Sequence, residues 1–420
     1  MNISLFIARR LRIKGGTRKS SSSSSVIAVA GIAIAIFVMV LTLTVVLGFK
    51  NQIREKVSGF DSQISILPPI IANDSSDLTV THNDKLLNLI SSAMDINGSN
   101  ASVALTLKQP GIMKTDDNFA GLIFKGVSNI SHLDFVKENL IAGEIPNFEN
   151  DSCKNKVVIS STTANALNIA LGDKINSYFF TDNNIRARKF EIVGIYNSNF
   201  NEYDKLIAFA PLSTLQRIAQ IDSVSGSAIE IRGIDHDDIV PMSTQIQWVI
   251  HQAVYNKEFD KLYAIDNVLQ SGAMYFNWLD LLDTNVVVIL ILMSCVAGFT
   301  LISCLFIIIL ERVKTIGLLK AMGATNAQVR QIFRHMAQRL VLRGMIIGNI
   351  LSLSFVFVQE KFHLIALDPE AYYLSYVPVE INWWHMLILN ICVIIVSSAI
   401  LILPSHLAST ISPAQTMRYE

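Results

Sequence analysis

Residues 26–48 read VIAVAGIAIAIFVMVLTLTVVLG, and this uncharged run decides the fold class of the chain. An α-helix rises about 1.5 Å per residue, so about 20 apolar residues cross the roughly 30 Å hydrocarbon core of a bilayer. The apolar core of a cleavable signal peptide is shorter, at about 7–15 residues. We therefore predict that this run forms an uncleaved membrane-spanning helix.

Three further apolar runs are long enough to cross a bilayer, at residues 285–310, 340–358 and 385–404. Of the 420 residues, 51% are hydrophobic and only 16% are charged. A soluble domain carries about 25% charged residues, so this composition favours a membrane protein. The predicted fold class is membrane α-helical, with four transmembrane helices and an inserted α+β domain at residues 49–284.

Lysine and arginine are unequally distributed among the segments that flank these runs. The N-terminal segment (residues 1–25) and the connection at residues 311–339 are basic, whereas the loop at residues 359–384 has one lysine. Basic segments remain on the cytoplasmic side of a membrane. We therefore expect both termini, including the tail at residues 405–420, in the cytoplasm, and the inserted domain on the opposite side.

The inserted segment alternates strand-like and helix-like stretches, which is the pattern of an α+β domain, here with two subdomains. The expected strands are residues 63–66, 156–159, 190–195, 206–209 and 228–231. The expected helices are residues 85–94, 161–171, 212–221 and 243–256.

The sequence lacks the patterns of an enzyme or of a self-powered transporter. Residues 15–20 (GGTRKS) lack the GxxxxGK[ST] spacing of a phosphate-binding loop. No GxSxG elbow or His/Cys metal motif is present, and the apolar runs contain almost no ionisable residues. We therefore expect no catalytic residue, no metal site and no cofactor on this chain. The formal net charge of zero gives no indication of nucleic-acid binding.

Residues 310–325 (LERVKTIGLLKAMGAT) form the most informative part of the basic connection. Apolar residues recur there at helical spacing among charged ones, at Val313, Ile316 and Leu319. This pattern predicts a short amphipathic helix that ends at Gly323. Periodicity leaves two interpretations open: a helix that rests on lipid headgroups, and a docking element for a soluble partner.

Thr325 or Asn326 is expected to cap a following helix over residues 327–338, which continues into the third apolar run. That run contains Gly344-x-x-x-Gly348, and the first run contains Gly31-x-x-x-Ala35. Small residues at this spacing allow membrane helices to approach closely.

The order of several motifs resembles the FtsX-like permeases of bacterial ABC systems, and within them the Lol-type lipoprotein-releasing permeases. The motifs include Phe6–Leu11, residues 166–175 (ALNIALGDKI), 190–196 (FEIVGIY) and 316–325 (IGLLKAMGAT), and the ending Ser412–Glu420. The resemblance covers nearly the whole chain. Thr315 is a departure, because many members of the family have an acidic residue at this position.

The resemblance implies a type VII ABC transporter-like permease in the bacterial inner membrane, with its inserted domain in the periplasm. A separate cytoplasmic ATPase dimer would bind ATP and Mg²⁺, and a second permease chain, identical or homologous, would complete the complex. The ATPase would dock on the connection through Glu311, Arg312, Lys314, Thr315, Ile316, Gly317, Leu318, Lys320 and Gly323.

The resemblance further implies release of lipoproteins from the membrane lipid to a periplasmic carrier. A lipid anchor gains about 0.8 kcal/mol per buried CH₂, so its acyl chains require apolar surroundings throughout. The expected lining residues are Leu43, Val46, Leu47, Phe49, Met274, Leu282 and Val286. Two alternatives remain within the superfamily: an exporter that drives an envelope channel by mechanotransmission, and a permease that regulates a cell-wall hydrolase during division.

Overall fold

The computed structural model describes residues 20–69, 79–95, 101–128, 130–181, 184–258 and 261–402. Most of the predicted basic N-terminal segment lies outside the described residues, as do Phe6–Leu11, the predicted tail at residues 405–420 and its motif Ser412–Glu420.

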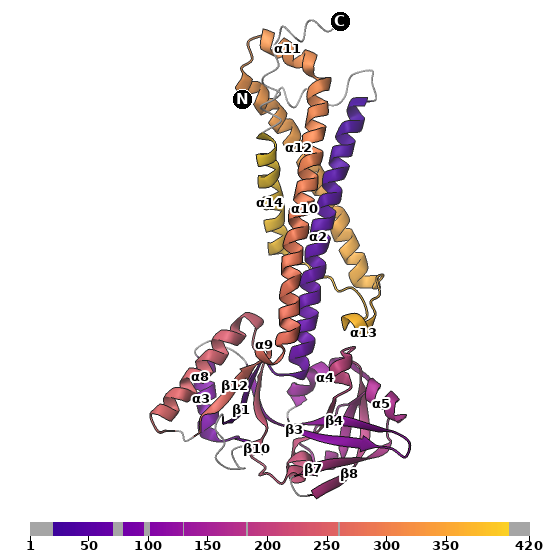
Figure 1. Cartoon of the computed structure of the whole chain (residues 1–420), viewed down its shortest axis with the longest axis vertical. Helices are drawn as coiled ribbons and strands as arrows, with labels where there is room; N and C mark the ends of the chain where they lie inside the picture. The colour runs from indigo at the N-terminus through magenta and orange to yellow at the C-terminus, as the bar shows by residue number, and fades with distance from the viewer. Residues whose placement is uncertain are drawn as a thin grey trace. The chain divides into compact units, whose positions relative to one another are not determined.

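Within the described residues, four helices are long and apolar enough to cross a membrane. They are α2 (Ser20–Phe60), α10 (Ala273–Glu311), α12 (Asn326–Phe362) and α14 (Trp383–Ile400) (Figure 1). The chain is therefore a membrane α-helical protein.

The first two helices extend beyond the apolar runs that revealed them. The run at 26–48 continues without interruption to Phe60, and the run at 285–310 belongs to a helix that begins at Ala273. Hydropathy marks only the part of a helix that suits hydrocarbon. The polar end of α2 keeps one apolar stripe, because Ile53, Val57 and Phe60 are fully buried at helical spacing.

The described residues divide into two compact units. The helix unit comprises residues 20–51, 279–366 and 376–402, and the domain unit comprises residues 52–278 and 367–375. The expected inserted domain was residues 49–284. Part of the loop at residues 359–384, including α13 (Pro369–Tyr372), therefore belongs to the domain unit rather than to the helices that it connects.

The glycine pair of α12 packs directly against α2, so the predicted close approach of helices is confirmed. A Cβ atom on Gly344 would lie 2.7 Å from Ile32 Cγ2, and one on Gly348 would lie 2.7 Å from the Ala33 carbonyl oxygen. On the other side, α12 is joined to α14 by an amide pair, in which Asn349 Nδ2 donates to Asn390 Oδ1 at 2.8 Å.

Ten strands of the domain unit form one sheet, in the order β12-β1-β11-β3-β4-β9-β6-β8-β5, with β7 paired to β3 and β8. They are β1 (Ile64–Pro69), β3 (Ser102–Lys114), β4 (Phe119–Val127), β5 (Leu140–Gly143), β6 (Lys156–Ser160), β7 (Lys174–Thr181), β8 (Asn184–Tyr196), β9 (Ile207–Pro211), β11 (Ala228–Arg232) and β12 (Tyr263–Asn267). Two short strands, β2 (Val80–Thr81) and β10 (Ser225–Gly226), pair separately.

The domain helices are α3 (Asp84–Asp95), α4 (Asp134–Glu138), α5 (Ser161–Leu167), α6 (Asn201–Asp204), α7 (Leu212–Ala219), α8 (Ile239–Tyr255) and α9 (Val268–Ser271), with 3₁₀ turns at Ile130–Leu133, Asp151–Cys153 and His236–Asp238. Strand β3 belongs to both halves of the sheet, because residues 102–106 pair with β11 and residues 107–114 pair with β4. The two halves are therefore joined by one continuous strand.

The local predictions were partly wrong at element ends. Helix α5 ends at Leu167 rather than at residue 171, because Asn168 adopts the left-handed conformation that terminates helices. Helix α8 begins at Ile239 rather than at residue 243, since Pro241 is tolerated in a first turn. The long strand β3 was missed because Pro110 and Gly111 interrupt its pattern.

Candidate functional site

The connection between α10 and α12 folds as helix α11 (Val313–Ala321), and its end is set by local sequence. Gly323 has a φ of +93°, a conformation that favours glycine. Thr325 then forms a capping box: its hydroxyl accepts from the Gln328 backbone N–H, and its own N–H donates to Gln328 Oε1 at 2.9 Å. The predicted helix end and cap are confirmed.

One face of α11 is buried within this chain. Ile316 is 1% exposed and packs in a cluster with Val329 and Phe333 of α12 and with Leu305 and Ile308 of α10. Gly317 is also buried. A narrow pocket between α11 and α12 is lined by Arg312, Thr315, Ile316, Leu319, Val329, Ile332, Phe333 and Met336.

The opposite face of α11 is exposed and partly apolar. Glu311, Lys314 and Gly323 are exposed, and Arg312, Thr315 and Lys320 are half-buried. Leu318 is 63% exposed and Met322, which the sequence did not single out, is 75% exposed. The nine predicted residues therefore do not form one surface: Ile316 and Gly317 hold the helix in place, and the remainder surround it.

The seven predicted lining residues are also divided. Leu43, Val46, Leu47 and Leu282 are half-buried in the helix unit, whereas Phe49 and Val286 are buried there. Met274 belongs to the domain unit, and its side chain is exposed.

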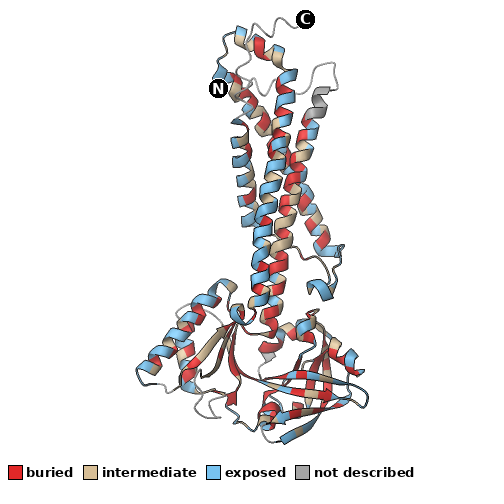
Figure 2. Cartoon of the chain, in the orientation of Figure 1, coloured by how far each residue is buried: buried red, intermediate tan, exposed pale blue. Residues whose placement is uncertain are grey.

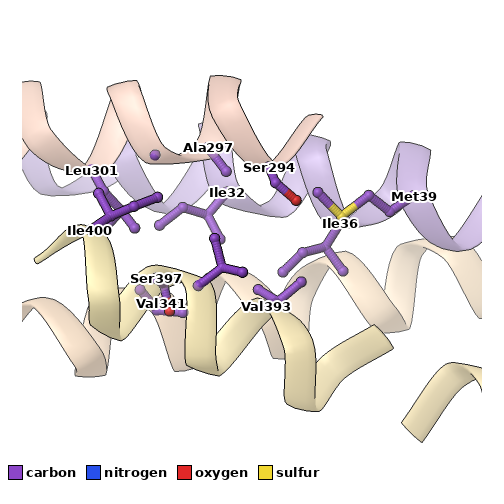
Figure 3. Close-up of a pocket in the computed structure, with 12 residues that line it drawn as sticks. Ile32, Ile36, Met39, Ser294, Ala297, Leu301, Val341, Val393, Ser397 and Ile400 are labelled. Atoms are coloured by element: carbon purple, nitrogen blue, oxygen red, sulfur yellow. The ribbon is translucent and has the colours of Figure 1, made fainter. Parts of the chain in front are cut away.

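A different pocket lies inside the helix unit, and none of the seven predicted residues lines it. All four helices contribute to its lining: Ile32, Ile36, Met39, Ser294, Ala297, Gly298, Leu301, Val341, Val393, Val396, Ser397 and Ile400. Figure 3 shows these side chains converging on the space between the helices. The lining is apolar apart from two serine hydroxyls. Within uniformly apolar runs, no sequence signal distinguishes its residues from lipid-facing ones.

Polar contacts join the helices just beyond their apolar runs. Lys50 Nζ of α2 lies 2.6 Å from Asp283 Oδ2 of α10. Asn51 Nδ2 donates to Glu380 at 2.6 Å, and the Glu380 N–H donates to the Thr44 carbonyl at 3.0 Å. These contacts link α2 to α10 and to the loop that precedes α14. Among the described residues, no group of three or more His, Cys, Asp or Glu is placed to hold a metal ion.

Much of the apolar surface of the helix unit is left uncovered by the chain itself. In the most apolar 18-residue stretch of each helix, only 17% of α10 and 11% of α14 is buried inside the chain. Exposed residues predominate along both helices in Figure 2. These faces suit lipid or other membrane helices.

Two family profiles match the sequence. The profile described as MacB-like periplasmic core domain matches residues 25–247, and that described as FtsX-like permease C-terminal matches residues 286–413. Residues 248–285 lie between the two matched ranges.

Curated relatives include lipoprotein-releasing system transmembrane proteins. LolC of Xylella fastidiosa (strain 9a5c) is 20% identical over 56% of this chain and 56% of its own length. LolC of Neisseria meningitidis is 22% identical over 67% of each chain, and LolE of Haemophilus influenzae is 21% identical over 88% of each. The chain thus spans little more than half the length of the Xylella protein.

Solved structures resemble the chain only distantly. The periplasmic region of MacB from Actinobacillus actinomycetemcomitans is 16% identical and covers 53% of this chain and 97% of its own, with a TM-score of 0.34. The extracellular domain of the transporter YknZ from Gram-positive bacteria is 14% identical and covers 49% of this chain and all of its own, with a TM-score of 0.33.

Proposed function

The chain belongs to the FtsX-like permease family and carries a MacB-like periplasmic core domain, and from this premise we propose that it is the membrane subunit of an ATP-driven ABC complex. The complex lies in the bacterial inner membrane, with both termini of this chain in the cytoplasm. It extracts lipoproteins from the outer leaflet and transfers them to a periplasmic carrier. The names of the LolC and LolE relatives support this choice of substrate.

The single observation that carries the proposal is the division of α11 into two faces. Ile316 fixes the helix to α10 and α12, while Leu318 and Met322 remain exposed on the other side. Leu318 lies on α11 and Met322 directly follows it, and the chain also exposes the charged residues Glu311 and Lys314 nearby in sequence. Exposed apolar residues with charged neighbours have the character of a protein interface with a polar rim. We assign this face to a partner ATPase dimer.

Because α11 packs on two membrane helices, a displacement of α11 acts on both of them. The residues that pack against it include Leu305 on α10, which precedes α11 in the chain, and Val329 on α12, which follows it. In the proposed cycle, ATP and Mg²⁺ are bound and hydrolysed by the partner, and this chain performs no covalent chemistry. A second permease chain and lipid cover the uncovered faces of α10 and α14.

A depletion experiment tests the substrate. When the protein is depleted from its host and the membranes are separated, outer-membrane lipoproteins are expected to accumulate in the inner membrane. Expression of the intact chain should restore their distribution. Normal lipoprotein distribution after depletion would refute the proposed substrate. In that case, measurements of drug export and of cell separation would examine the exporter and division-associated alternatives.

A docking experiment tests the partner surface independently of the substrate. Leu318→Asp places a charge on the exposed face of α11 and is expected to abolish co-purification of the ATPase. Phe362→Asp is the matched control, because Phe362 is an apolar residue with the same 63% exposure at the opposite end of α12. Equal ATPase recovery from the two variants would argue against docking on α11.

A further inference from the structure

The end of helix α2 enters a cluster of buried charges in the domain unit. A helix leaves its last carbonyl groups without intrahelical donors, and they carry partial negative charge. Here the carbonyl of Phe60 accepts from Lys125 Nζ at 2.8 Å. The guanidinium of Arg232 donates to the carbonyls of Ser58 at 3.3 Å and Gly59 at 3.1 Å.

A buried carboxylate holds these two cations in place. Glu230 lies 2.7 Å from Lys125 Nζ and 3.4 Å from Arg232 Nη2. The Lys125 and Glu230 side chains are each only 2% exposed. Burying an ammonium group is unfavourable unless it is paired and hydrogen-bonded, and this pair satisfies both conditions.

Residues 59–61, at and directly after the end of α2, make close contacts with the domain unit. Asp61, directly after α2, accepts from Lys108 Nζ at 3.0 Å and from the Tyr203 hydroxyl at 2.8 Å. The Phe60 ring is fully buried and stacks on Tyr203 with a centroid separation of 4.9 Å. A Cβ atom on Gly59 would lie 2.3 Å from the Phe135 ring, so no side chain fits between α2 and α4.

The cations come from both halves of the sheet. Lys125 lies on β4, Arg232 and Glu230 lie on β11, and these strands flank β3, which carries Lys108. We propose that this cluster is a socket that fixes the end of α2 to both halves of the sheet, so that the domain unit follows any movement of α2. Helix α2 runs without a break from Ser20 to Phe60 and contains no proline, so it is suited to this role.

The test distinguishes loss of the socket from loss of folding stability. Removing one partner of a buried pair destabilises a protein strongly, whereas replacing both partners by apolar residues is often neutral. Lys125→Met/Glu230→Met/Arg232→Met replaces every member of the buried triad and leaves no cation without its carboxylate. It is therefore expected to fold, with a melting temperature close to that of the parent, while losing the Lys125 and Arg232 donors to α2. The control is Lys174→Met/Glu191→Met, which changes residues opposite each other on β7 and β8.

The readout is a pair of distances in the full-length protein, in a background without Cys153, Cys295, Cys304 and Cys392. Spin labels replace exposed Glu55 on α2 and either Lys189 on β8 or Gln252 on α8, one in each half of the domain. Narrow distance distributions are expected in the parent and the control, and broadened ones in the socket variant for both label pairs.

Unchanged distributions in a folded socket variant would overturn the proposal. If that variant does not fold, Arg232→Gln provides the second test, because it removes the guanidinium contacts to the carbonyls of Ser58, Gly59 and Phe60 and leaves Lys125 paired with Glu230. Narrow distributions in Arg232→Gln would equally overturn the proposal. Because the measurement uses neither an ATPase nor a lipoprotein, its result is independent of the proposed function.

Discussion

At the scale of single residues, His132 illustrates how burial changes chemistry in the domain unit. Its side chain is almost fully buried, and its Nε2 lies 3.3 Å from the Ser102 hydroxyl. Its Nδ1 has no hydrogen-bond partner among the described residues. Burial, with a contribution from the nearby Arg232, lowers the pKa of His132 to about 4. The folded protein therefore holds this imidazole neutral at pH values where an unfolded chain would protonate it.

This difference predicts a specific loss of stability in acid. Because the folded pKa of about 4 lies below the unfolded value of 6.5, the stabilisation is present above pH 6.5 and is lost as the pH falls toward 4. His132→Gln should reduce the slope of unfolding free energy against pH by up to about 1.4 kcal/mol per pH unit in this window. Thermal unfolding of the full chain in detergent from pH 4 to 7 measures it.

A second buried group makes the comparison with the parent protein necessary. Burial raises the pKa of Asp204 to about 6, so its contribution has the opposite sign: the folded state binds its proton more tightly, and stability rises as the pH falls through 6. Asp204 is present in both proteins, so its effect cancels in the difference. Identical slopes for the parent and His132→Gln would contradict the prediction.

At the scale of elements, α12 is held to α2 by the absence of side chains at two positions. A Cβ atom on Gly348 would lie 2.7 Å from the Ala33 carbonyl oxygen and 2.9 Å from Ile36 Cβ. These two atoms are fixed to the backbone of α2, so they can move away only if α2 itself shifts. The contact was predicted from small-residue spacing in the sequence. Which helix lies opposite was not, because spacing carries no information on the partner.

Gly348→Ala is therefore expected to destabilise the helix unit by about 1–3 kcal/mol, the range of an overpacked contact. Gly298→Ala in α10 is the control, since its Cβ would meet only the end of the flexible Ile400 side chain, at Cδ1. Unfolding of both full-length variants in the same detergent provides the comparison. A smaller loss for Gly348→Ala than for Gly298→Ala would count against direct helix contact.

At the scale of the whole molecule, the α13 segment belongs to the domain although it connects α12 to α14. Lys56 Nζ donates to the Tyr373 carbonyl at 2.7 Å, and the Tyr373 ring packs edge-on against Phe200 with a centroid separation of 4.9 Å. The Tyr373 hydroxyl also reaches Glu202. The chain therefore passes between the domain unit and the helix unit at four points, which lie within α2, within α10 and on both sides of the segment that contains α13.

Tyr373→Ala is expected to release this segment. Hydrogen exchange of residues 367–375 should become faster, while strands such as β6 keep their protection, because only the ring packing and the hydroxyl contact of Tyr373 are removed. Tyr372→Ala is the control, since this neighbouring ring is 48% exposed. Similar exchange in the two variants would show that Tyr373 does not hold the segment.

Much of this protein follows from sequence alone. The uncharged runs specify the membrane helices, because only uninterrupted apolar segments satisfy hydrocarbon. The end of α11 follows from Gly323 and Thr325, whose effects on the backbone are local. Element ends that depend on packing, such as the start of α10, were displaced from their predicted positions.

The tertiary structure decided which residues face one another. It buried Ile316 and left Leu318 exposed, although both are apolar residues of one short helix. It also formed an inner pocket at Ile32 and Ile36, which the sequence did not single out. It brought Lys125 and Glu230, 105 positions apart in the chain, to the end of α2. Such pairings depend on contacts between distant segments, and local composition and periodicity do not encode them.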